Sequence, residues 1–191
     1  MLAVSWRSAA PPRIGAAEDV VASLFPGVSH GRHEGPGLHH VWWGDAGIDD
    51  PVHALQTMAG GFVADRAPAD LPAAVLDGSV LDRVHPPFAA VVRTSPSVLS
   101  VRVDGIGFRH VYAAEGRGWA AVSTSARALA TLAGATIDLD TVGMQSLLGW
   151  QTGLGTFYRG VTKLGPGVSA RIDAGALHRS APVPATRAPE T

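Results

Sequence analysis

Alternating apolar and polar positions predict a group of short strands in the second half of the chain. In VLSVRV, residues 98–103, Ser100 and Arg102 alternate with apolar side chains, the period-two pattern of a half-buried strand. Three similar runs, separated by the turn-forming segments TSPS, DGIG and EGRG, lie at 88–93, 108–115 and 119–124. Because turns recur about every ten residues, we predict an antiparallel meander of four strands.

Three segments instead have the apolar spacing of helices. TSARALATLAG (124–134) has a helical apolar stripe with a Ser or Thr cap and a glycine at its exit. A second helix is predicted from Asp140, as its cap, to about Leu148. Near the N-terminus, AAEDVVASLFPG (16–27) predicts a helix with Glu18 and Asp19 in its first turn.

The remaining segments complete the predicted organisation. Strands are expected at 2–6, 38–44 and, more weakly, 57–66, a loop at 29–37, one short helix within 71–84, and one or two strands within 155–175 around a Gly-Pro-Gly turn. Residues 1–178 are predicted to form one domain, and 179–191 a tail or linker rich in Pro and Ala. Strands dominate and helices come in pairs, which favours an α+β fold with helices covering antiparallel sheet.

Composition narrows the possible functions. The formal net charge is −1, so no basic surplus points to nucleic acid or an anionic membrane. The chain has no cysteine, which excludes disulfides, thiolate metal sites and a cysteine nucleophile. No run approaches the ~20 apolar residues of a membrane helix, and the N-terminus lacks the pattern of a signal peptide. We expect a soluble, cytoplasmic protein.

Histidines form the main candidate metal site. His30 and His33 could be a zinc-binding pair completed by His39 or His40, with Glu34 as an added carboxylate. Strand alternation places neighbouring side chains on opposite faces, so the last two histidines cannot easily face one ion. The favoured interpretation is a polar loop entering a strand, and no metal site is predicted.

Hydroxyl nucleophiles are the second alternative. Ser5 could act only with an activating neighbour, and the sequence shows none. Ser79, Asp82 and His85 could be combined into a triad, but any chain of this length permits such combinations. We therefore assign no catalytic residue.

Two segments resemble asparagine-synthetase-like proteins. In 103–134, Asp104 and Gly107 match an Asp-x-x-Gly turn, and Tyr112 matches an aromatic of the strand that follows. In GTFYRGVTKLGPG, a signature of the family's closing segment is matched by Thr156, Phe157, Tyr158, Gly160, Val161, Leu164, Pro166 and Gly167. HGRHEGPG (30–37) is more loosely similar to a His-Arg-Gly-Pro loop. The resemblance is strong over 88–167 and weak over 2–44, and it does not extend to the residues between.

The resemblance implies an N-terminal nucleophile (Ntn) hydrolase-like domain, an αββα sandwich of two antiparallel sheets flanked by helices. Active class II glutamine amidotransferases hydrolyse glutamine there and pass ammonia to an ATP-dependent synthetase domain. Their chemistry requires a thiol after the initiator Met, with its freed α-amine as base. It also requires an Asn-Gly pair for the oxyanion and an Arg for the substrate carboxylate.

This chain departs from the family pattern at each of these points. Leu2 occupies the nucleophile position, and Gly60–Gly61–Phe62 is the nearest counterpart of Asn-Gly-Glu. The segment LHHVWWGD has no Arg at the position expected to grip substrate. Loss of nucleophile, oxyanion donor and substrate clamp together predicts a pseudo-glutaminase without independent activity.

The chain also lacks the phosphate-binding loops of a synthetase. It contains no Ser-Gly-Gly-x-Asp, Walker-type or G-x-G-x-x-G motif, so ATP and Mg²⁺ are expected only in a synthetase partner or a further domain, and no cofactor in this chain. β-Lactam synthetases and lasso-peptide cyclases are relatives that keep a glutaminase-like domain without its cysteine. We therefore expect a scaffold or partner subunit of an ATP-dependent amide-forming ligase, with peptide natural-product biosynthesis as a candidate pathway. The alternative is a hydrolase or amidotransferase with an unrecognised nucleophile.

Large apolar side chains in the closing segment suggest where a partner would bind. In relatives this segment borders the synthetase domain, and buried aromatics beside an Arg are common interface anchors. The candidate interface residues are Trp150, Phe157, Tyr158, Arg159 and Lys163. Ordinary core packing is the competing explanation, as it is for Trp42 and Trp43.

Overall fold

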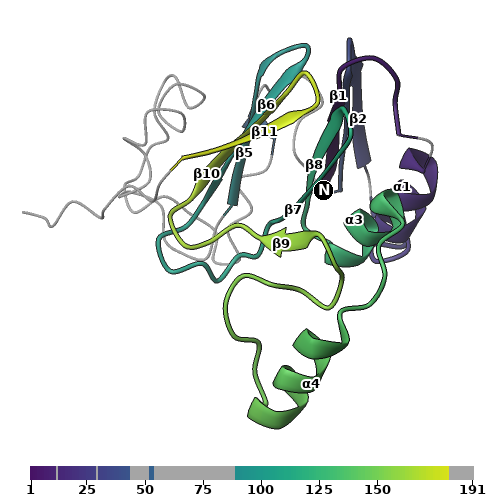
Figure 1. The fold of residues 1–191 in the computed structure, drawn as a ribbon. Coiled ribbons are helices and arrows are strands. Elements are labelled where there is room, and N and C mark those ends of the chain that lie inside the picture. Colours follow the sequence, from purple (N-terminus) through teal and green to yellow (C-terminus); the bar gives the residue numbers. More distant parts are fainter. Residues whose placement is uncertain (12, 29, 44–51, 54–88, 181–191) are drawn as a thin grey trace, which may run out of the picture.

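Two antiparallel sheets face each other, and two helices cover the outer face of one of them (Figure 1). The computed structural model describes residues 1–11, 13–28, 30–43, 52–53 and 89–180. The first sheet has the order β2 (His30–Gly35), β3 (Leu38–Trp43), β1 (Leu2–Trp6), β8 (Trp119–Ser123), β7 (Tyr112–Gly116), β9 (Val161–Lys163). The second has the order β11 (Ala176–Ser180), β10 (Ser169–Asp173), β6 (Val98–Val103), β5 (Ala89–Ser95), β4 (Val52–His53). The predicted α+β class is confirmed.

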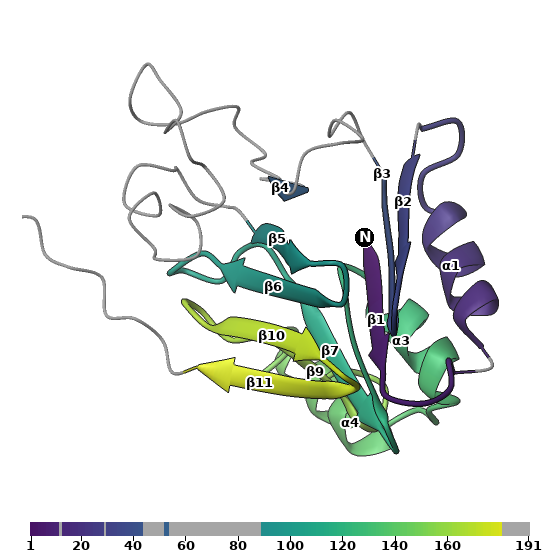
Figure 2. The same cartoon turned by 90° about the horizontal axis from the view of Figure 1, so that it is seen from above.

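Two hydrophobic cores form because strands of the first sheet are apolar on both faces. In β1, Ala3 faces the second sheet, whereas Leu2 and Val4 face the helices α1 (Ile14–Ala22) and α3 (Ala126–Ala133). We call these the inter-sheet core and the helix-side core. Figure 2 shows the two sheets from above, with α1 and α3 beside the first sheet. Among the described residues, helices cover only that side, so the described layers are helix, sheet, sheet.

The predicted meander is wrong, although its four strands exist. β5 pairs with β6 in the second sheet, and β7 pairs with β8 in the first. The chain crosses between the sheets after Val103, and β7 begins only at Tyr112. A local apolar pattern predicts strands but contains no information on which sheet each strand joins.

The crossover is organised by the carboxylate of Asp104, which is 1% exposed. One oxygen accepts hydrogen bonds from the backbone N–H groups of residues 106, 107 and 108, and the other from that of Arg109. The Asp104 carbonyl accepts from Gly107 N at 3.1 Å and Gly167 N at 2.9 Å. One residue therefore fixes the crossover and joins it to the Gly165–Pro166–Gly167 turn.

The segment 29–37, predicted as a loop, instead contains β2 and the turn of the β2–β3 hairpin. Its glycines are required by close packing. A Cβ at Gly31 would overlap the Trp42 ring, and one at Gly35 would overlap the Pro96 carbonyl oxygen. Glycine within a strand can mark such an approach, and here it was misread as a loop signal.

Helix boundaries also required correction. α1 begins at Ile14, so Glu18 and Asp19 lie beyond its first turn. α4 (Leu139–Leu148) is capped by Asp138, whose Oδ1 accepts from Thr141 N, while Asp140 lies within the first turn. The predicted caps of α3 are confirmed, with Ser125 at its start and Gly134 at its end.

Several predicted elements lie outside the described residues. These are the weak strand at 57–66, the helix within 71–84 and the tail from residue 181. β11 extends to Ser180, two residues past the predicted domain end at 178. Within the described ranges, no helix is long and apolar enough to cross a lipid bilayer.

Replacement of Asp104 by Ala should destabilise the protein strongly, because it leaves four partly buried backbone N–H groups of the crossover without their shared acceptor. We expect a loss of about 3 kcal/mol in the free energy of unfolding, measured by urea denaturation. Asp173→Ala, which removes an exposed ion pair with Arg171, is the matched control and should cost under about 1 kcal/mol. Equal losses in the two variants would contradict this role for Asp104.

Candidate functional site

Polar groups gather where β1 begins, at the position at which an Ntn-type nucleophile would be expected. The Met1 α-amine donates a hydrogen bond to Thr124 Oγ1 at 2.9 Å. The Met1 carbonyl accepts from Ser123 Oγ at 2.7 Å and from Thr124 N at 3.1 Å. The Met1 side chain is part of the inter-sheet core and is 3% exposed. The last residue of β8 therefore bonds the Met1 carbonyl, and the residue after that strand supplies the hydroxyl next to the amine.

The electrostatics of this end of the sheet favour neutral bases. Burial, assisted by the Arg109 cation, lowers the pKa of the Met1 α-amine to about 5. Burial and then the Lys163 cation lower the pKa of His110, and burial raises that of Tyr112. His110 Nδ1 lies 3.5 Å from Tyr112 Oη. At neutral pH the amine can thus accept a proton, an ability that cationic amines lack.

The residues considered as nucleophiles have structural contacts instead. Leu2 is fully buried in the helix-side core, so its side chain points away from the inter-sheet region. Ser5 is also fully buried, and its Oγ accepts a hydrogen bond from Gly175 N at 3.1 Å. This bond joins β1 to the β10–β11 turn. Ser79, Asp82, His85 and the segment 60–62 lie outside the described residues.

The four clustered histidines have different neighbours. His30 stacks on Trp43, and His40 contacts Trp42 with ring centroids 4.9 Å apart. His33 Nε2 lies 3.0 Å from the Pro96 carbonyl, and His39 Nε2 lies 3.2 Å from a Glu18 carboxylate oxygen. His39 and His40 face opposite sides of β3, as alternation predicts. Nowhere in the described ranges do three His, Asp or Glu side chains converge as a metal site.

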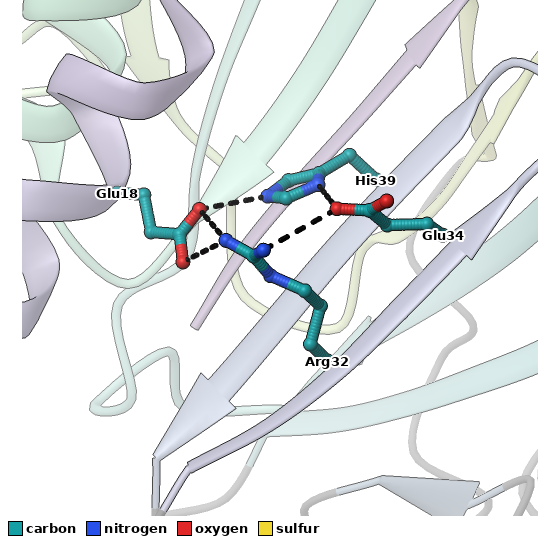
Figure 3. Close-up of polar contacts among 4 residues, drawn as sticks. All are labelled: Glu18, Arg32, Glu34 and His39. Atoms are coloured by element: carbon teal, nitrogen blue, oxygen red, sulfur yellow. Dashed lines mark hydrogen bonds and ion pairs between the residues drawn. The ribbon is translucent and has the colours of Figure 1, made fainter.

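An ion-pair cluster links α1 to the β2–β3 hairpin, and the sequence analysis missed it (Figure 3). Arg32 Nη2 donates to both Glu18 carboxylate oxygens, at 2.6 and 2.7 Å. His39 lies between the two acids, 3.2 Å from Glu18 and 3.6 Å from Glu34. The pairing Glu34↔His39 puts these side chains on one face. Recognition of β2 as a strand would have placed Arg32 and Glu34 on one face, but not Glu18, which the packing of α1 brings to them.

A surface of exposed apolar side chains surrounds α4, which has no buried residue. We define the α4 surface by its exposed large hydrophobic residues: Ile137, Leu139, Met144, Leu147, Leu148, Trp150, Leu154 and Phe157. The segment projects from the sheets (Figure 1) because its ends are paired at their base. Asp138 N donates to the Phe157 carbonyl at 2.8 Å, and Arg159 N to the Thr136 carbonyl at 3.0 Å.

The five predicted interface residues differ in their exposure and neighbours. Trp150 and Phe157, which are 66% and 39% exposed, belong to the α4 surface, and Arg159 is exposed next to them in sequence. Tyr158 packs against the helix-side core. Lys163 pairs with Tyr112 in the first sheet and acts electrostatically on His110. Trp42 and Trp43 are buried.

No family model matches the chain, and no curated protein matches it. The resemblance to asparagine-synthetase-like proteins therefore remains an interpretation of the motifs.

The ion-pair cluster should contribute measurably to stability. Glu18→Gln removes the charge that Arg32 and His39 share, and both hydrogen bonds involve a charged group. We expect a loss of about 1–2 kcal/mol in the free energy of unfolding, measured by urea denaturation. Asp19→Asn removes an exposed charge from the same helix and should change stability by less than about 0.5 kcal/mol. A Glu18→Gln effect no larger than this control would refute the role assigned to the cluster.

Stability should rise with pH between 6 and 8. The unfolded chain binds a proton on its α-amine below pH 8.0, whereas the folded protein does so only near pH 5. The stabilising contribution is therefore present above pH 8 and is lost as pH falls toward 5. We expect the free energy of unfolding to increase by about 2 kcal/mol from pH 6 to 8.

The His110→Asn variant separates the contributions of the Met1 α-amine and of His110 to the pH dependence of stability. His110 contributes in the same direction as the amine, because its folded pKa is also lowered. The variant should keep most of the increase above pH 7, where the amine dominates. A flat profile between pH 7 and 8 would show that the amine is not buried in solution.

Proposed function

We propose that the chain is a non-catalytic glutaminase-like domain with an Ntn-type sandwich, acting as a partner subunit of an ATP-dependent amide-forming ligase. Two facing antiparallel sheets and the central position of β1 support this proposal. So does the meeting of the two most similar motifs: a Cβ at Gly107 would lie 2.9 Å from Pro166 Cγ, and Asp104 accepts from Gly167. These contacts give both motifs a structural role that does not depend on a substrate.

The chemistry at β1 supports a role other than thiol-dependent glutamine hydrolysis. Thiol catalysis requires a cysteine, and the sequence contains none. The hydrocarbon side chain of Leu2 can neither attack a carbonyl nor be reoriented without leaving the helix-side core. Retention of the sandwich without its nucleophile is typical of a domain kept for its surface.

The observation that carries the proposal is the exposure of α4. A helix of 10 residues is marginal in water by itself, and one with apolar positions on several sides is usually buried. At about 100° per residue, the positions of Leu139, Met144, Leu147 and Leu148 span about half of the helix circumference. A flat face would cover only one stripe of such a helix. We therefore propose that the synthetase-type partner, which would hold ATP and Mg²⁺, receives α4 in a groove.

The proposal is tested by using the purified chain to capture a partner protein, and then assaying the complex of the two for amide formation. The captured protein should be identified and purified, and should form an amide product with release of pyrophosphate when ATP and Mg²⁺ are added. Leu147→Asp should weaken its binding at least tenfold, since it places a charge in an apolar groove. Leu24→Asp alters another exposed leucine, which lies outside the α4 surface, and should leave binding unchanged.

Two outcomes would refute this function. One is a captured partner without ATP-dependent amide formation. The other is a homodimer, seen by light scattering, that Leu147→Asp dissociates. If Leu147→Asp binds the partner as tightly as the wild type does, α4 is not the docking element.

A hydrolase is the second candidate, favoured by the contact between the Met1 amine and Thr124 Oγ1. The neutral amine could take the hydroxyl proton while Oγ1 attacks a substrate carbonyl, then return it to the leaving amine, and water would hydrolyse the resulting ester. Incubation with glutamine and an ammonia assay decides between the two functions. Sustained turnover abolished by Thr124→Val, but not by Thr152→Val, would establish the hydrolase.

A further inference from the structure

A cavity of about 380 Å³ lies along one side of α3, near the start of α1. Arg13, Arg127, Thr131 and Tyr158 bring polar side chains to its lining. The other lining residues, Ala130, Gly134 and Ala135, are small and leave space beside the helix backbone. The volume falls within the range of sites for small molecules.

The two guanidinium groups are not neutralised within the described part of the chain. The ion pairs found there involve Arg32, His39 and Arg171, whereas none involves Arg13 or Arg127. α3 contains no acidic residue, and α1 has none in its first turn. Glu18, further along α1, is already bound by Arg32. The lining residues therefore include two cationic side chains and no acidic one.

Capping of α3 requires neither arginine, although the helix dipole favours a cation at the C-terminal end of α3, where Arg13 lies. Arg127 lies in the first turn of α3, where a cation opposes the helix dipole. Arg13 lies over the other end of α3, against Gly134. That end already has its cap, because Gly134 N donates to the Thr131 carbonyl and Ala135 N to the Ala130 carbonyl. The arginine donors are thus not required for capping α3.

We propose that this cavity binds a phosphate group, free or carried as the monoester of a small molecule. Two guanidinium groups match the charge of a phosphate dianion, and their planar N–H arrays suit its oxygens. The hydroxyls of Thr131 and Tyr158 can donate further hydrogen bonds. This site is independent of the proposed partner-subunit function.

Titration calorimetry of the full chain tests the site, with inorganic phosphate and glycerol phosphate as probes at constant ionic strength. Phosphate should bind more tightly than acetate, which carries one charge. Arg13→Gln and Arg127→Gln should each weaken phosphate binding at least tenfold, the effect of losing about 1.4 kcal/mol from a charge-assisted hydrogen bond. Tighter binding of glycerol phosphate would identify the ligand as a monoester, and tighter binding of phosphate as the free ion.

Arg117→Gln is the matched control, because Arg117 is exposed between β7 and β8 and does not line the cavity. It should leave phosphate affinity unchanged. The proposal is overturned if the wild type binds phosphate no better than the Arg13→Gln, Arg127→Gln double variant does. It is also overturned if Arg117→Gln weakens binding as much as either single variant, since the effect would then be one of overall charge.

Discussion

The crossover between the two sheets depends on one buried carboxylate. Asp104 takes up the backbone N–H groups of the segment that leaves β6 for the first sheet, and its carbonyl holds the Gly165–Gly167 turn between β9 and β10. Both connections between the sheets in this half of the molecule therefore meet at one residue. A buried acceptor with several backbone donors can define a turn more sharply than apolar packing can, because its hydrogen bonds are directional.

The contacts of the sandwich explain the residues on which the family resemblance depends. The positions that resemble the asparagine-synthetase-like family are those that build the crossover and the closing segment, where Thr156 Oγ1 donates to the Val161 carbonyl and accepts from Tyr158 N. These contacts stabilise backbone geometry and involve no reacting group. Binding surfaces commonly lie on projecting segments held by a rigid scaffold, and α4 is such a segment.

Much of the fold was predictable because its determinants are local. The strand at 98–103 and the caps of α3 follow from side-chain period and cap chemistry, and both are confirmed. β2 was missed because Gly31 and Gly35 have the composition of a loop, whereas their role is to admit Trp42 and Pro96. Such packing requirements connect residues distant in sequence. The exposure of Trp150 and Phe157 could not be decided either, since apolar side chains are suited equally to a core and to an interface.

The sequence alone determined that the chain has no thiol, because it contains no cysteine. It also predicted the strands from their side-chain period, and the helix α3 from its caps at Ser125 and Gly134. Only the tertiary structure decided which sheet each hairpin joins, because pairing depends on the crossover at Asp104. It also brought Glu18 to Arg32 and His39, and Arg13 to the side of α3. These associations arise from packing of α1 against the first sheet and α3, which no local pattern encodes.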